Sequence, residues 1–110
     1  MKEKKHYIDP FDLTQMPTFF TLTGTSFHYG HEFLEPGMPV ILEKEPDNKF
    51  DKEAIQVKLP GLGLIGYVAN SPKTVIGESL SAGRLYDKID DVTKGNVLYV
   101  LPDAVLCIVS

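Results

Sequence analysis

Residues 54–68, AIQVKLPGLGLIGYV, carry the clearest fold signal in the sequence. Residues 54–59 alternate apolar and polar side chains, which is typical of a strand with one buried face. Residues 60–63 (PGLG) have the composition of a turn, and residues 64–68 (LIGYV) form a second short apolar run. The stretch therefore predicts a β-hairpin.

Further short strands are expected on both sides of this hairpin. Residues 18–27, with Gly24 marking a bulge or a close backbone approach, and residues 38–45 precede it. After the hairpin, a fifth strand is predicted at residues 84–92 and a turn at Gly95-Asn96. One or two further strands are predicted in residues 97–109, with an interruption at Pro102-Asp103. Between them, Ser71-Pro72 predicts the start of a helix that ends near Gly83.

The order of these elements indicates a mainly β protein. About six short, mostly antiparallel strands with one or two helices favour a small β-barrel. Too few helices separate the strands for a parallel α/β sheet. With 110 residues, the chain has the length of one domain, and we expect an N-terminal arm at residues 1–17 and the barrel at residues 18–110.

Composition narrows the class of protein. The chain has one cysteine, Cys107, so neither an intrachain disulfide nor a cysteine-based zinc site is expected. No apolar run is long enough to span a membrane, and the basic N-terminus lacks the apolar segment of a secretory signal. We therefore expect a cytoplasmic protein without a membrane partner. The net charge of −4 argues against a general nucleic-acid coat protein but leaves local recognition of a few nucleotides open.

An acidic cluster in residues 45–57, EPDNKFDKEAIQV, allows three interpretations. A calcium loop is a poor fit, because Lys49 and Lys52 stand at the third and sixth positions, where an oxygen ligand and a glycine are needed. A glycosidase pair is also a poor fit, because carboxylates in one turn rarely face each other across a cleft. The third interpretation is a solvated turn, since Asp and Asn side chains bind nearby backbone amides.

The remaining candidates for chemistry are weak. His28 and His31 could share a metal with Glu32 or Glu35, but two loop histidines are more often surface residues. Ser26 with His28 lacks an organised nucleophile turn, and the glycines of residues 60–66 do not form a phosphate loop. We therefore predict no catalytic residues, no metal site and no cofactor, and the chain is expected not to be an enzyme.

Aromatic residues lie at predicted strand ends and turns, at positions 27, 29, 50 and 67. Such rings can pack into a core, or they can stack nucleic-acid bases at a barrel rim. Without further information, packing into the core is the favoured interpretation of these rings.

The spacing of these motifs resembles the HIRAN domain family from about Thr21 to the end of the chain. The resemblance is carried by residues 24–30 (GTSFHYG), by residues 37–57 (GMPVILEKEPDNKFDKEAIQV) and by Ile65-Gly-Tyr67. It implies a modified OB-like barrel and a standalone member of the family. It also implies a non-catalytic module that binds the 3′ end of single-stranded DNA, with a role in DNA repair.

The resemblance assigns roles to individual residues. Phe27 and His28 match a stacking pair, Asn48, Phe50 and Asp51 match the loop that recognises the 3′-hydroxyl, and Tyr67 matches a further DNA contact. Auxiliary candidates are Ser26, Tyr29, Asn70 and Lys73.

The chain departs from the DNA-binding members of this family in its charges. Ser26 replaces a basic residue, Ala69-Asn70 replaces a lysine-rich step, and Phe50 replaces a tyrosine. Two phosphate contacts are thereby lost, so the resemblance implies weak DNA binding. The alternative is a protein-interaction or accessory module on the same barrel, with a helicase or nuclease as partner.

Overall fold

The alternation of apolar residues determines which face of each strand is buried. In β3 (Ile55–Leu59), Ile55, Val57 and Leu59 are buried while the two residues between them are partly exposed. A short turn joins β3 to β4 (Gly63–Val68), and the two strands pair antiparallel. Gly61 and Gly63 supply this turn with positive φ angles of 85° and 100°. The predicted hairpin is therefore confirmed.

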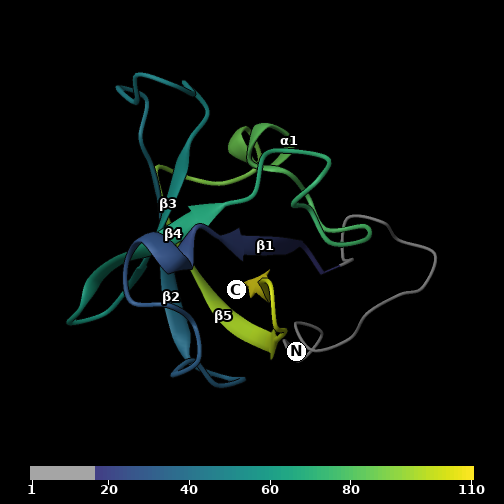
Figure 1. Ribbon diagram of the computed structural model, residues 1–110. Coiled ribbons are helices and arrows are strands. Elements are labelled where there is room, and N and C mark those ends of the chain that lie inside the picture. Colours follow the sequence, from purple (N-terminus) through teal and green to yellow (C-terminus); the bar gives the residue numbers. More distant parts are fainter. Residues whose placement is uncertain (1–16) are drawn as a thin grey trace, which may run out of the picture.

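The computed structural model describes residues 17–110, and these form a closed barrel of six antiparallel strands (Figure 1). The spatial order is β1-β4-β3-β2-β5-β6, and pairing of β1 with β6 closes the barrel. The other four strands are β1 (Phe19–Thr23), β2 (Pro39–Lys44), β5 (Val92–Val100) and β6 (Val105–Val109). One 3₁₀ helix, η3 (Thr25–Phe27), and one α-helix, α1 (Ala82–Tyr86), complete the described elements. The predicted fold class, an OB-like barrel with about six short strands, is confirmed.

The barrel interior is filled by side chains from all six strands and from α1. Its fully buried members include Phe20, Leu22, Leu42, Ile55, Val57, Ile65, Leu85, Val97, Val105 and Cys107. No helix in residues 17–110 is long and apolar enough to cross a membrane.

The junction between β1 and β4 is short. These strands pair only through Leu22 with Val68 and Thr23 with Tyr67. Beyond this point the neighbour of β1 is the segment before α1, where the Leu80 N–H donates to the Phe19 carbonyl. A buried hydrogen bond of 2.8 Å between the hydroxyls of Thr21 and Ser79 reinforces this contact.

The helix predicted at Ser71-Pro72 is wrong in position. Ser71 does start a turn, because the Val75 N–H donates to its carbonyl oxygen at 3.0 Å. The next amide, of Ile76, donates instead to Thr21 Oγ1, and Gly77 has a φ of 52° that a right-handed helix does not allow. The α-helix begins ten residues later, after the cap Ser81, so Gly83 lies inside the helix and does not end it.

Three further expectations about the strands need correction. Residues 84–92 are not a strand, since α1 occupies their first part and β5 begins only at Val92. Gly95-Asn96 lies inside β5, where a Cβ at Gly95 would stand 2.7 Å from the Ile108 carbonyl oxygen. The first strand ends at Thr23, because Gly24 adopts a φ of 76° before η3. The predicted arm lies outside the described residues except for Pro17.

Candidate functional site

The Ile65-Gly-Tyr67 step holds η3 against β4. A Cβ at Gly66 would lie 2.5 Å from the Thr23 carbonyl oxygen and 3.4 Å from Thr25 Cγ2. Only a glycine permits this approach, which explains why the step needs one. As a result, η3 with Phe27 projects from the barrel beside the strand that carries Tyr67.

The loop between β2 and β3, residues 45–54, is organised by its own side chains. Asn48 Oδ1 accepts the N–H groups of both Phe50 and Asp51 at 2.9 Å. Asp51 Oδ1 accepts the Glu53 N–H at 2.9 Å. The Ala54 N–H donates to the Asp51 carbonyl oxygen. The acidic cluster is therefore a hydrogen-bonded turn.

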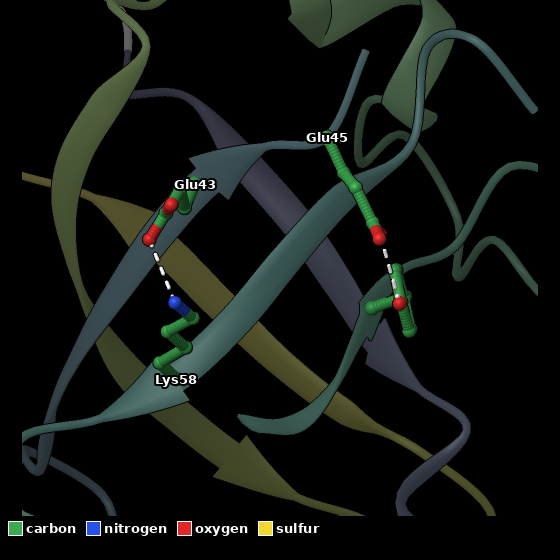
Figure 2. A network of polar contacts seen from close by, with 4 residues as sticks. Glu43, Glu45 and Lys58 are labelled. Carbon is green, nitrogen blue, oxygen red and sulfur yellow. Dashed lines mark hydrogen bonds and ion pairs between the residues drawn. The ribbon is translucent and has the colours of Figure 1, made fainter. Parts of the chain in front are cut away.

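Glu45 connects this loop to the barrel. Its Oε1 accepts the Tyr67 hydroxyl at 2.9 Å and the Asn48 side-chain amide at 3.2 Å. Figure 2 shows Glu45 beside a neighbouring ion pair, in which Lys58 on β3 lies 2.8 Å from Glu43 on β2. The hydrogen bond from Asn48 is the main cause that lowers the pKa of the Glu45 carboxyl below 4.5, and burial opposes it. Burial, followed by the Glu45 carboxylate, raises the pKa of Tyr67 above 10.0.

The structure brings four of the six predicted contact residues into one cleft. Asn48, Phe50, Asp51 and Tyr67 line an open cleft of about 420 Å³, together with Ala54 and Val68. The Phe50 side chain is 96% exposed, and Tyr67 is half-buried. The cleft thus combines an accessible aromatic face with hydrogen-bond acceptors.

Phe27 and His28 do not line this cleft. Both are exposed, Phe27 to 86%, and belong to η3 or the residue after it. Of the auxiliary candidates, Ser26 is exposed within η3, and Tyr29 is exposed shortly after it. Lys73 lines a separate cleft of about 500 Å³ next to Thr23.

Asn70 lies at the edge of the first cleft. Its Nδ2 donates to Asp51 Oδ2 at 2.7 Å. It is therefore joined to the site through Asp51, although it does not line the cleft itself.

The histidines have different surroundings. His31 connects η3 to the β5–β6 turn, with Nδ1 2.7 Å from Thr25 Oγ1 and Nε2 3.0 Å from the Pro102 carbonyl oxygen. Within residues 17–110, no group of three or more His, Cys, Asp or Glu side chains could hold a metal ion.

Glu45 is the site residue that the sequence-based reasoning missed. It follows the last residue of β2 and stands three residues before Asn48, so both side chains can meet in one turn. Its contact with Tyr67 depends on the order β2-β3-β4 in the barrel, and only the turn contact had a local sequence signal.

Comparison with known proteins places the chain in a family. A sequence model of the HIRAN domain matches residues 17–87. Among solved structures, the crystal structure of the HIRAN domain of human HLTF superposes with a TM-score of 0.57. It covers 84% of this chain and 74% of the HLTF chain, at 18% sequence identity, and therefore shows a shared fold. No curated protein matches the sequence. Since the family model spans more than half of its length, the chain belongs to the HIRAN domain family.

Proposed function

We propose that this chain is a non-catalytic module that recognises the 3′ end of single-stranded DNA. The observation that carries the proposal is the shared cleft, which is lined by the exposed Phe50 and by Asp51. A base stacked on an exposed ring contributes about 1–3 kcal/mol, whatever its identity. A terminal nucleotide would thereby be held next to Asp51.

The loop is suited to a ligand that donates hydrogen bonds. The amides of Asn48, Phe50, Asp51, Glu53 and Ala54 all have acceptors inside the loop or at its base. These five amides are therefore already engaged and do not face a ligand as donors. The Asp51 carboxylate oxygens each accept one N–H and have room for a second hydrogen bond. A terminal 3′-hydroxyl fits this arrangement, whereas a 3′-phosphate meets like charge.

Affinity for the rest of the strand needs further contacts. Phe27 on η3 offers a second exposed ring, with His28 beside it. Lys49 and Lys52 are exposed on the site loop. In the described part of the chain neither forms an ion pair, since only Lys44 and Lys58 do so. Lys49 and Lys52 can therefore supply phosphate contacts that Ser26 and Asn70, which carry no charge, cannot make. We expect the binding to be sensitive to salt.

The test is fluorescence anisotropy with a short oligodeoxynucleotide, labelled at its 5′ end and carrying either a 3′-hydroxyl or a 3′-phosphate. We expect the hydroxyl form to bind about tenfold tighter or more, because surface charges at about 4 Å interact by a few kcal/mol. Asp51→Asn removes the charge and should narrow the difference. Asp47→Asn is the matched control, since Asp47 is an exposed acid of the same loop that does not line the cleft. Equal binding of the two oligonucleotides by the unmodified protein would refute the proposal.

A second candidate function is protein binding on the same barrel. It is favoured by the net charge of −4, which opposes nucleic-acid binding in general. A pull-down that recovers a helicase or nuclease, combined with no oligonucleotide binding at low salt, would support this function over the first.

A further inference from the structure

Asn70 lies between the site loop and α1, and it has one hydrogen bond to each. Its Nδ2 donates to Asp51 Oδ2 at 2.7 Å, and its Oδ1 accepts the Gly83 N–H at 2.8 Å. The adjacent Ala82 N–H donates to the Ala69 carbonyl at 2.9 Å. Amides in the first turn of a helix have no partner within the helix. The first turn of α1 therefore anchors residues 69–70 through two of them.

This anchoring determines how the Asn70 carboxamide is oriented. The Gly83 N–H can only donate, so it must face Oδ1 of Asn70. The Nδ2 group then points to Asp51. Asp51 Oδ1 is held independently by the Glu53 N–H. Both carboxylate oxygens are thus fixed, and the carboxylate cannot rotate without breaking one of the two bonds.

The three segments that meet here are closely packed. A Cβ at Gly83 would lie 2.8 Å from Glu53 Oε1 and 3.4 Å from Asn70 Oδ1. Figure 1 shows α1 and the β2–β3 loop at the same end of the barrel. The position of Asp51 is therefore linked to α1, which contributes no side chain to the cleft.

We propose that Asn70 is a positioning residue, which directs the Asp51 carboxylate toward a donor ligand and sets the preference for a hydroxyl over a phosphate. This inference rests on the proposed function. It gives Asn70 a role within the protein in place of a direct contact with DNA. Its effect should therefore pass entirely through Asp51.

A double-mutant cycle tests this role. The 3′-hydroxyl and 3′-phosphate oligonucleotides are bound to the unmodified protein, Asn70→Ala, Asp51→Asn and the double variant. Asn70→Ala should reduce the ratio of the two affinities by about tenfold or more, as expected for loss of one hydrogen bond to a charged group. In the Asp51→Asn background it should change the ratio no further, because a residue that acts through Asp51 has nothing left to position.

Asn96→Ala is the matched control. Asn96 also has two side-chain hydrogen bonds, one to the Gly37 carbonyl and one from the Ser110 hydroxyl, and it lies in β5 outside the site. This variant should leave the affinity ratio unchanged. A similar loss of discrimination in both asparagine variants would indicate a general structural effect and overturn the inference.

A second measurement does not depend on DNA or on a folded Asn70 variant. In proton–nitrogen correlation spectra, the Asn70 side-chain amide should exchange with solvent more slowly in the unmodified protein than in Asp51→Ala, which lacks its acceptor. Unchanged exchange would overturn the inference. If Asp51→Asn abolishes the preference for the 3′-hydroxyl but Asn70→Ala preserves it, the inference about Asn70 fails and the proposed function stands. If the unmodified protein shows no preference between the two oligonucleotides, the proposed function fails as well as the inference.

Discussion

Replacing Gly66 by alanine should destabilise the barrel substantially. The added Cβ would lie 2.5 Å from the Thr23 carbonyl oxygen and 2.7 Å from Leu22 Cδ1. An ordinary contact needs about 3.4 Å or more, so β1 and β4 must separate by close to 1 Å. Overpacking of this kind costs about 1–3 kcal/mol. For a domain of this size, 2 kcal/mol corresponds to a decrease in Tm of roughly 10 °C.

The assay is urea denaturation followed by circular dichroism, with Gly83→Ala as the matched control. A Cβ at Gly83 also has a short contact, of 2.8 Å, but with the flexible end of Glu53. This side chain can move away, and alanine is about 1 kcal/mol better than glycine within a helix. We therefore expect Gly83→Ala to have a stability within about 0.5 kcal/mol of the unmodified protein, or to exceed it. A Gly66→Ala protein that is equally stable would refute the argument from close backbone approach.

Three further predictions concern exposure and ionisation. Phe50→Ala should change the free energy of unfolding by less than about 0.5 kcal/mol, because the ring is 96% exposed, yet weaken oligonucleotide binding about fivefold or more. Tyr99→Ala, at another exposed ring, is the control, and equal losses of binding would contradict the site assignment. Glu45→Gln should reduce stability above pH 4.5, measured by urea midpoints across pH. The folded-state pKa of Glu45 is lowered, so its contribution is present above 4.5 and is lost as the pH falls through the folded value. If the difference in stability between Glu45→Gln and the unmodified protein grew toward acid pH, the expected direction of the pH dependence would be wrong. Burial raises the pKa of Cys107 to about 12, so a thiol reagent at pH 8 should label it only after unfolding, and rapid labelling of the native protein would show the thiol to be accessible.

The hairpin was predictable because its signals are local. Alternation in residues 54–59 places Ile55, Val57 and Leu59 on one face whatever the rest of the chain does. The helix was misplaced because its start signal was overridden by tertiary contacts. Ser71 begins only a turn where a helix was predicted, because Thr21, fifty-five residues before Ile76, accepts the amide that would have continued the helix.

The site was predictable only in part, because some of its contacts join residues that are distant in the sequence. Asn48, Phe50 and Asp51 follow one another in a turn, so their grouping is visible in the sequence. Their contact with Tyr67 depends on the pairing of three strands, and the contact of Asn70 with Asp51 spans nineteen residues. No periodicity or spacing in the chain encodes these distances. The resemblance to a family supplied the position of Tyr67, and the structure supplied its partner Glu45.

The short junction between β1 and β4 has a consequence for the dynamics of the protein. Only two residue pairs join these strands, so this is where local opening of the barrel needs the fewest broken hydrogen bonds. Phe27 lies in η3, which continues the chain from β1 and packs against β4, and Tyr67 belongs to β4. A ligand that contacted both rings, as proposed above, would help to hold the junction closed. Occupancy of the proposed site and the local stability of the barrel would then be thermodynamically linked, and slower amide exchange in β1 and β4 would report that a ligand is bound.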